Sequence, residues 1–265
     1  MMKKMVLVKF GGSLITDKTR PFTPKLKIIN RLCLELARAR KKSSKLLIVG
    51  NGGGSFPHQP AVEYRTAEGI VDKNSFYGMA VVEDVAVQLN RIIISQLLKI
   101  NEPAFGINPS SLMITQNGEI KKAFLPPIEK LLELEMLPVV YGDVGLDTKM
   151  GCCILSTEKI LNYLALRLRQ KGYLVEKIIL TGITDGVYNA QGKTIQKLTP
   201  GKFKKLKKNI KASNGIDVTG GMSHKVSQAV KLAKIGIKTL IINGQVAGNL
   251  EEAILDQKTK GTLIS

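Results

Sequence analysis

The stretch Met5-Val6-Leu7-Val8-Lys9-Phe10-Gly11-Gly12-Ser13 decides the fold class of this chain. Its apolar run predicts a short buried strand, and its glycine pair predicts a tight turn directly after that strand. The same order returns at residues 46–49, which run into Gly52-Gly53-Gly54. A helix follows each turn in the pattern, and repeated strand–turn–helix units predict a parallel sheet covered by helices.

Helical patterns separate the predicted strands along the whole chain. Residues 25–40 carry apolar side chains at helical spacing, and residues 75–100 carry a longer apolar stripe. We also predict strands at 138–141, 177–180 and 239–242, and helices at 157–170, 223–235 and 249–255. These elements predict an α/β fold, a three-layer αβα sandwich with a mostly parallel central sheet, in a single domain over residues 1–265.

The composition suits a globular protein with a sizeable core, because 44% of the 265 residues are hydrophobic. No apolar run approaches the roughly 18–20 residues of a membrane span. The apolar run after Lys3-Lys4 is too short for a signal peptide. The three cysteines, Cys33, Cys152 and Cys153, lack the spacing of a zinc site or a disulfide framework. We therefore expect reduced core thiols in a cytoplasmic protein that has no membrane partner.

The chain is strongly basic, with 40 Lys and Arg against 21 Asp and Glu, a net charge of +19. One cluster is Arg38, Arg40, Lys41, Lys42 and Lys45, and a second lies between Lys193 and Lys211. Basic proteins often bind nucleic acid. Here Trp is absent and aromatic residues make up 5%, which leaves few side chains to stack on bases. We expect nucleic acid not to be a partner, and a basic surround that attracts a polyanionic substrate.

Glycine turns gather where the predicted strands end, at the edge of the sheet where ligands bind in such folds. Backbone N–H groups at such turns approach anions closely, and the following helix adds a positive dipole. The turns contain neither the P-loop motif nor the dinucleotide fingerprint. Phosphoryl transfer would therefore take its cations from elsewhere, and the candidates are Lys9, Lys18 and Lys225.

Five strings of this sequence resemble the amino acid kinase family, in the family's order. They are Lys9-Phe10-Gly11-Gly12-Ser13, Gly52-Gly53-Gly54-Ser55-Phe56-Pro57-His58, Tyr141-Gly142-Asp143, Thr184-Asp185-Gly186-Val187-Tyr188, and Asp217-Val218-Thr219-Gly220-Gly221-Met222 with Lys225. The second and the last are the most specific, and they are most similar to members that phosphorylate isopentenyl phosphate. The resemblance implies ATP-dependent conversion of isopentenyl phosphate to the diphosphate, a reaction of isoprenoid biosynthesis.

The resemblance also implies roles for individual residues. For catalysis these are Lys9, Lys18 and His58; for the acceptor, Gly53, His58 and Thr157; for ATP, Lys9, Gly11, Gly12, Ser13, Gly54, Ile183, Asp185, Tyr188, Gly221 and Lys225. His58 would donate a hydrogen bond to the acceptor's own phosphate. Family members that phosphorylate a carboxylate or a carbamate have no such need, so His58 indicates the substrate class. The other histidine, His224, is expected to have no role.

The resemblance further implies two halves, an acceptor half over about residues 1–170 and a nucleotide half over about 171–265. It implies Mg²⁺ beside ATP, no metal held by protein ligands alone, and a homodimer. Asp143 and Asp185 would orient lysines or a hydrated Mg²⁺, because an ionised phosphate acceptor needs no general base. The lysine-rich stretch 193–211 would be a basic flap on the nucleotide side.

Four places depart from the family pattern. Pro57 stands where glycine is usual, which stiffens the loop before His58. Ser156-Thr157-Glu158 replaces Ser-Gly-Asp, so a backbone contact with the acceptor would come from Thr157. Ile183 replaces a common aspartate. Residues 169–174 are expected to form a longer external loop between a helix and a strand.

Other functions stay open on the sequence. Phe76, Met79, Val82 and Ile93 are candidates for an apolar pocket that takes a hydrocarbon tail, although most of such a stripe is expected to be helix core. A phosphonate kinase of the fosfomycin-resistance type would share the histidine-bearing loop. A carboxylate kinase, such as a glutamate or acetylglutamate kinase, would share the fold. A basic nucleic-acid-binding protein is the alternative that is not an enzyme.

Overall fold

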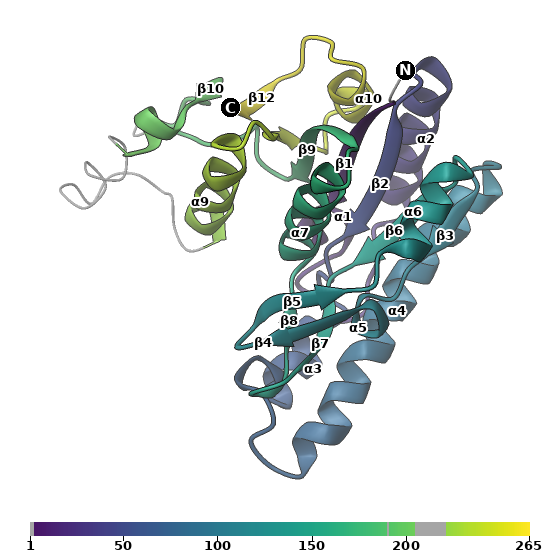
Figure 1. The fold of residues 1–265 in the computed structure, drawn as a ribbon, viewed down its shortest axis with the longest axis vertical. Coiled ribbons are helices and arrows are strands. Elements are labelled where there is room, and N and C mark those ends of the chain that lie inside the picture. Colours follow the sequence, from purple (N-terminus) through teal and green to yellow (C-terminus); the bar gives the residue numbers. More distant parts are fainter. Residues whose placement is uncertain (1–2, 190, 205–220) are drawn as a thin grey trace.

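The computed structural model describes residues 3–189, 191–204 and 221–265 (Figure 1). An eight-stranded sheet forms its centre, in the order β10-β12-β11-β9-β1-β2-β6-β3. Its strands are β1 (Lys4–Phe10), β2 (Leu46–Asn51), β3 (Ala104–Gly106), β6 (Leu137–Tyr141), β9 (Leu174–Gly182), β10 (Lys197–Leu198), β11 (Lys238–Asn243) and β12 (Gly261–Ile264). Across the sheet, the neighbouring strands β11, β9, β1, β2, β6 and β3 are all parallel, and β12 pairs antiparallel with β11. The predicted, mostly parallel sheet is confirmed.

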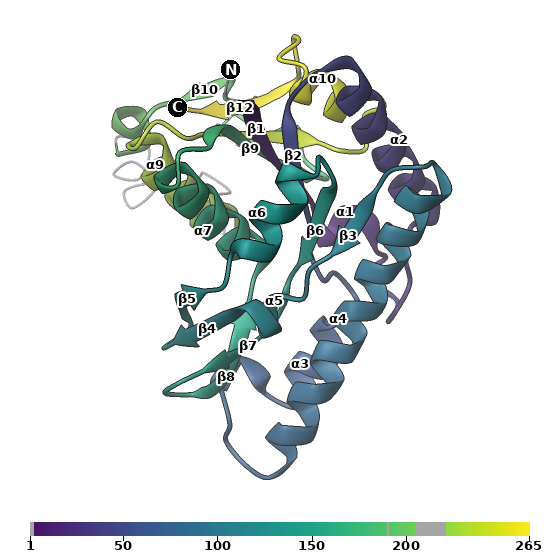
Figure 2. The same ribbon diagram turned by 45° about the vertical axis from the view of Figure 1, so that its right-hand side comes forward.

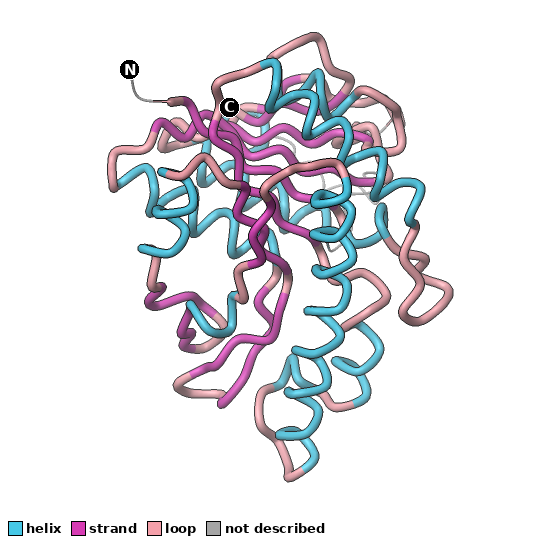
Figure 3. Tube along the Cα trace, turned by 90° about the vertical axis from the view of Figure 1, so that its right-hand side faces the viewer, coloured by secondary structure: helices cyan, strands magenta, loops and turns pink. Residues whose placement is uncertain are grey.

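Helices cover both faces of this sheet, which confirms the three layers (Figures 2 and 3). One face packs against α2 (Leu26–Lys42), α4 (Asn74–Lys99) and α10 (Asn249–Ile254), and the other against α6 (Pro126–Glu133), α7 (Thr157–Gln170) and α9 (Gly221–Ala233). Successive side chains of β1 alternate between the two cores: Met5 and Leu7 join one, Val6 and Val8 the other. Because both faces are buried, the strand is a continuous apolar run in the sequence.

A second, four-stranded sheet lies beside the lower half of α4, and the sequence did not predict it (Figure 1). Its strands are β4 (Met113–Gln116), β5 (Glu119–Ala123), β7 (Asp143–Asp147) and β8 (Gly151–Leu155). Asp147 fixes the two hairpin turns together, since its carboxylate accepts hydrogen bonds from the N–H groups of Asn117, Gly118, Lys149 and Met150. These hydrogen bonds hold the pKa of Asp147 well below its usual range, although burial opposes them.

Short helical elements fill the connections: α1 (Gly12–Ile15), α3 (His58–Glu63), the 3₁₀ turn η1 (Thr66–Glu68) and α5 (Pro109–Leu112). The long external loop expected at 169–174 was wrong. The helix α7 continues to Gln170 and β9 begins at Leu174, so only a tight turn remains, with Gly172 at a φ of 96°. The three cysteines are free and buried, as predicted. In the part of the chain that the structure describes, no helix combines the length and apolar character that a membrane crossing requires.

Candidate active site

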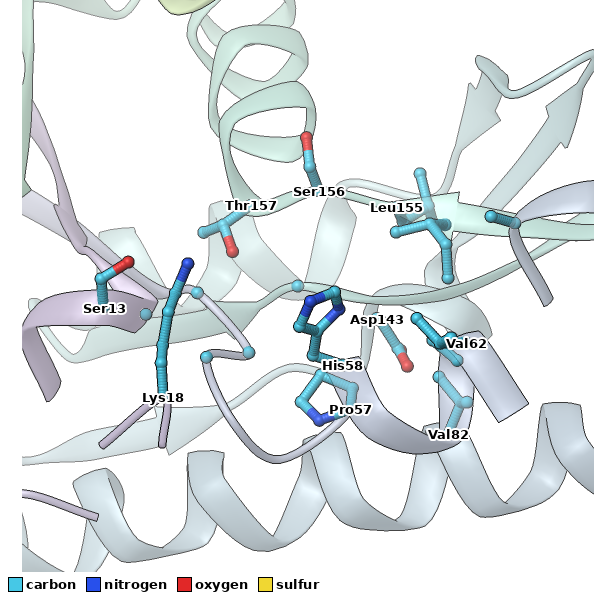
Figure 4. Close-up of a pocket in the computed structure, with 18 of the residues that line it drawn as sticks. Ser13, Lys18, Pro57, His58, Val62, Val82, Asp143, Leu155, Ser156 and Thr157 are labelled. Atoms are coloured by element: carbon cyan, nitrogen blue, oxygen red, sulfur yellow. The ribbon is translucent and has the colours of Figure 1, made fainter. Parts of the chain in front are cut away.

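A cavity of about 570 Å³ lies where β1, β2 and β6 end (Figure 4). Lys9, Lys18 and the two glycine loops line one end of it, and mainly apolar side chains, with the ion pair of Arg65 and Glu68, line the other. Figure 4 shows His58 between these ends, with Ser13 and Lys18 on one side and Val62 and Val82 on the other. The cavity therefore joins a cationic, glycine-rich end to a mainly apolar end, and we call it the acceptor cavity after the role that the sequence predicts for His58.

The two glycine loops touch each other backbone to backbone. A Cβ on Gly12 would lie 2.5 Å from the Gly54 nitrogen, and one on Gly52 would lie 2.8 Å from the Gly12 nitrogen. Gly11 packs against the end of β9 instead, where a Cβ would come within 2.4 Å of the Thr181 oxygen. Only glycine fits these approaches, which let backbone N–H groups line a site for anions.

A single carboxylate joins two of the predicted lysines. The Nζ of Lys9 is buried in an ion pair with Glu158, and the Nζ of Lys225 lies 3.8 Å from the same Oε1. Glu158 sits in the first turn of α7, whose start is capped by Ser156. The sequence contained Glu158 as a departure but gave it no role. The signal that could have found it is an acidic residue in the first turn of a predicted helix, in a chain where two lysines are predicted to bind phosphate.

Burial and charge act against each other in this pair. Burial lowers the pKa of Lys9, Glu158 opposes the change, and Lys225 and Lys18 lower the pKa further. Burial also raises the pKa of Glu158, but Lys9 and Lys225 outweigh it, so the net pKa is lowered. Glu158 thus stays ionised and favours the charged form of Lys9 at the wall of the acceptor cavity.

Lys18 and Ser13 share the same end of the acceptor cavity. Both line it, and Lys18 is exposed. In Figure 4 its amine points toward Thr157. Such a mobile cation can follow negative charge as it moves between phosphoryl oxygens.

His58 is the first residue of α3 and lines the acceptor cavity. Pro57 precedes it at a φ of −83°, and its ring lies against Gly53. A Cβ on Gly53 would come within 2.2 Å of the Pro57 Cγ. Proline in place of the usual glycine therefore fixes the second glycine loop by contact as well as by its own stiffness.

Thr157 lines the acceptor cavity and is buried. Its hydroxyl donates a 2.7 Å hydrogen bond to the Asn51 carbonyl at the end of β2. The threonine that replaces the family's glycine thereby ties the start of α7 to the strand that leads into the second glycine loop.

The two aspartates are placed differently. Asp143 lines the acceptor cavity, and its carboxylate accepts hydrogen bonds from the N–H groups of Val144 (2.8 Å) and Ser110 (3.1 Å). The pKa of Asp143 is raised to about 6, and burial is the main cause. The negative charge of Glu83 adds to the increase, while the two hydrogen bonds act in the opposite direction. Asp185 pairs with Lys260 at 2.7 Å and accepts a hydrogen bond from Asn243. Neither aspartate forms an ion pair with Lys9, Lys18 or Lys225 among the described residues; Glu158 is the carboxylate that pairs with Lys9 and Lys225.

Known proteins share the sequence pattern and the fold of this chain. The model of the amino acid kinase family matches residues 4–243. The chain belongs to the amino acid kinase family. It is 32% identical to an isopentenyl phosphate kinase of Methanothermobacter thermautotrophicus, over 98% of this chain and 99% of the relative. It is 30% identical to one of Methanocaldococcus jannaschii, over 98% of each chain. A solved isopentenyl phosphate kinase structure superposes with a TM-score of 0.82 at 28% identity, over 98% of this chain and 100% of that one.

The apolar end of this amino acid kinase's cavity takes one of the four predicted side chains of α4, as expected for a stripe that is mostly helix core. Of the four candidates on α4, Val82 lines the cavity. Ile93 is buried in the core under the sheet, Met79 packs against the small cluster around Val82, and Phe76 is 60% exposed. The sequence missed the other apolar walls, which come from α3 and β8: Ala61, Val62, Ile154 and Leu155.

Of the residues predicted for the nucleotide, Lys9, Gly12, Ser13 and Gly54 line the acceptor cavity, and the others lie outside it. Ile183, Asp185 and Tyr188 follow β9 and do not line the acceptor cavity. The Tyr188 hydroxyl accepts a hydrogen bond from the Asp185 N–H at 3.1 Å, so the two share one turn. Gly221 begins α9, the helix that carries Lys225. Contacts of these residues with ATP stay predictions.

The structure describes the first basic cluster in full and the second only in part. Four of the five cations at 38–45 are in ion pairs: Arg38 and Lys42 with Glu251, Arg40 with Glu102, and Lys45 with Glu176 and Asp256. That cluster is therefore largely neutralised and offers little free charge to a polyanion. The last part of the predicted flap, residues 205–211 with Lys205, Lys207, Lys208 and Lys211, lies outside the described residues.

Proposed function

We propose that this amino acid kinase phosphorylates isopentenyl phosphate with ATP, giving isopentenyl diphosphate and ADP for isoprenoid biosynthesis. The observation that carries the proposal is the acceptor cavity itself, in which His58 separates a cationic, glycine-rich end from an apolar end. A phosphate with a short hydrocarbon tail matches both ends. The full-length similarity to isopentenyl phosphate kinases supports the same substrate.

In the proposed reaction an oxygen of the acceptor's phosphate attacks the γ-phosphorus of ATP. The bond from that phosphorus to the β–γ bridging oxygen breaks, and ADP leaves. A phosphate monoester is largely ionised near pH 7, so no general base has to remove a proton. The chain's task is positioning and charge stabilisation. We assign Lys9 and Lys18 to the transferring group, His58 to the acceptor's phosphate, and Glu158 to holding Lys9 and Lys225 in place.

Mg²⁺ accompanies ATP in this proposal. Mg²⁺ usually keeps several waters and is bound through nucleotide phosphates with one or two carboxylates. Within residues 3–189, 191–204 and 221–265 no three acidic, histidine or cysteine side chains cluster as a metal site. We therefore assign the ion to the phosphates of ATP, where it would neutralise charge on the leaving group.

Three further proposals concern the whole protein: a cytoplasmic location, the division into an acceptor half and a nucleotide half, and a homodimer. For the dimer we favour the edge strand β3, which ends the eight-stranded sheet. Phe105 on this strand is 51% exposed, and Leu98 at the end of α4 is 50% exposed. Exposed edges of this kind pair readily with a second copy. Light scattering of the wild type and of Phe105→Lys tests this proposal.

Activity with four acceptors tests the function. The purified protein is incubated with Mg²⁺ and ATP plus isopentenyl phosphate, dimethylallyl phosphate, fosfomycin or glutamate, and the products are identified by ³¹P NMR. We expect a diphosphate signal with isopentenyl phosphate at the highest kcat/KM. A phosphonate anhydride formed from fosfomycin at higher kcat/KM would overturn the proposal in favour of a phosphonate kinase. ATP use with glutamate alone would favour a carboxylate kinase.

A further inference from the structure

A separate cavity, of about 460 Å³, lies between the end of β5, the linker from β5 to α6, and the C-terminal half of α7. We call it the β5–α7 pocket. It shares none of its lining residues with the acceptor cavity, and the proposed reaction gives it no task. Its volume falls within the roughly 300–1,000 Å³ of pockets that take small molecules.

Positive charge dominates the wall of the β5–α7 pocket. Among the described residues its lining contains no Asp or Glu but four cations, Lys121, Lys122, Arg167 and Lys171. Lys171 is paired with Glu129 at 3.0 Å. The other three form no ion pair with any residue that the structure describes. The negative end of the α7 dipole offsets only about half a charge, so most of their positive charge stays available to an anion.

Arg167 is held at the wall of the β5–α7 pocket while most of its donors stay uncommitted. Its guanidinium carbon lies 5.2 Å from the centre of the Tyr163 ring, and its Nη1 donates a 3.0 Å hydrogen bond to the Gln170 Oε1. Both partners also line the pocket. A guanidinium carries five N–H donors in a planar fork, which matches two oxygens of one phosphate group. With two lysines beside it, this fork favours a phosphate as the bound anion.

Phe124 adds a flat apolar surface to the same pocket. Its side chain is 64% exposed and lines the cavity from the linker between β5 and α6. The backbone there is fixed, because the Phe124 N–H donates a 2.9 Å hydrogen bond to the Leu112 carbonyl and Pro126 begins α6 two residues later. An accessible aromatic ring beside unpaired cations is the combination with which proteins bind nucleotides, since the ring stacks on a base while the cations neutralise phosphate.

We infer that the β5–α7 pocket binds a free nucleoside phosphate, with the phosphate groups at Lys121, Lys122 and Arg167 and the base against Phe124. The cations and the ring line one bounded cavity, which suits a single small molecule. A single-stranded nucleic acid presents the same groups, but its backbone follows a groove of positive charge over several nucleotides. The inference does not rest on the acceptor of the proposed reaction.

Equilibrium dialysis with radiolabelled ADP tests this inference by counting sites. ADP is a product of the proposed reaction and should occupy one site in the nucleotide half, so the β5–α7 pocket adds a second. Phe124→Ala removes the ring, and Phe76→Ala, whose side chain is 60% exposed on α4, is its matched control. Arg167→Gln removes the guanidinium, and Arg169→Gln makes the same change in the last turn of α7 but outside the pocket. None of these four residues lines the acceptor cavity.

We expect two ADP molecules per chain in the wild type and in both controls. The affinity of the second site should fall about 5–100-fold in Phe124→Ala, from the loss of stacking. It should fall at least about 10-fold in Arg167→Gln, from the loss of charged hydrogen bonds. The count is the same whether or not isopentenyl phosphate is the acceptor, so the proposed function can fail without deciding this test.

Three results would overturn the inference. One is a single ADP per chain in the wild type whose binding neither pocket variant weakens. Another is inorganic phosphate that displaces the second ADP as well as unlabelled ADP does, which would show that no base is recognised. The third is a single-stranded oligoadenylate that binds more than 10-fold tighter than ADP and depends on Phe124 and Arg167, which would assign the pocket to a nucleic acid.

Discussion

The Lys9 ammonium group and the Glu158 carboxylate form a buried ion pair, although 149 residues separate them in the chain. One lies at the end of β1 and the other in the first turn of α7. The pair brings a fixed positive charge to the wall of the acceptor cavity without leaving that charge unpaired in the core. Removing one partner of a buried pair is costly, because the other charge stays behind without compensation.

Glu158→Gln tests this pairing. Without the carboxylate, burial and the positive charges of Lys225 and Lys18 lower the pKa of Lys9 further, because the opposing influence is gone. Lys9 then loses its proton at a lower pH than in the wild type. We expect kcat to fall at least 10-fold at pH 8 and the alkaline limb of the kcat profile to move to lower pH. Rate measurements from pH 6 to 10 check this.

The matched control is Glu119→Gln, which removes a largely exposed partner of Lys159. Exposed pairs contribute about 0–1 kcal/mol, so its pH profile should match that of the wild type. A Glu158→Gln enzyme with an unshifted alkaline limb would show that Lys9 does not depend on this carboxylate.

His58→Ala tests the assignment of the acceptor end. A hydrogen bond to a charged group contributes about 1.5–3 kcal/mol, so kcat/KM for isopentenyl phosphate should fall roughly 10–150-fold. The KM for ATP should change only a few-fold, since His58 is assigned to the acceptor's phosphate, and the predicted nucleotide residues Ile183, Asp185 and Tyr188 do not line its cavity. His58→Gln or His58→Asn keeps a neutral donor and should recover part of the loss. His224→Ala, which changes the other histidine, should keep wild-type kcat/KM; equal values for both alanine variants would contradict the role of His58.

The sequence predicted the central sheet and the anion-binding end of the cavity for the same reason. A buried parallel strand must be continuously apolar, and a backbone that approaches another backbone must be glycine, so Met5–Val8 and Gly12 carry their structural roles in their residue types. The pairing of Lys9 with Glu158 could not be predicted in this way. It depends on where α7 begins in space, which no local pattern states.

The apolar end of the acceptor cavity shows a second limit of prediction from the sequence. Helical periodicity identified the buried stripe of α4 but not which turn of that stripe faces a cavity. Val82 lines the cavity, while Ile93 is core and Phe76 faces solvent. The missing walls come from the six-residue α3 and the five-residue β8, neither of which was predicted as an element.

The raised pKa of Asp143 makes the stability of the folded protein depend on pH, and it decides whether stability rises or falls with pH. Burial raises this pKa to about 6 from 3.8, so between these values the folded state binds more protons than the unfolded state. Stability contributed by this group is therefore lost as pH rises from about 4 to about 6. Asp143→Asn cannot ionise, so its free energy of unfolding relative to the wild type should increase by up to about 3 kcal/mol over this range.

Urea unfolding of the wild type and of Asp143→Asn at pH 4.5, 5.5, 6.5 and 7.5 measures this difference. Asp185→Asn serves as the control, because hydrogen bonds from Lys260 and Asn243 lower the pKa of Asp185. Its difference from the wild type should not follow the same trend. A constant gap between Asp143→Asn and the wild type across the series would mean that Asp143 titrates at its ordinary pKa.

Gly53 and Pro57 give a test in which one substitution should partly correct another. A Cβ on Gly53 would lie 2.2 Å from the Pro57 Cγ, which is closer than any packed contact permits. Gly53→Ala must therefore displace the proline ring and with it His58, and we expect kcat/KM for isopentenyl phosphate to fall at least 10-fold. Pro57→Gly removes the ring, restores the loop usual in the family, and should keep activity. In the double variant the clash is absent, so kcat/KM should exceed that of Gly53→Ala. Equal losses in the single and the double variant would show that Gly53 is required for its own N–H geometry at the acceptor and not for the space that Pro57 occupies.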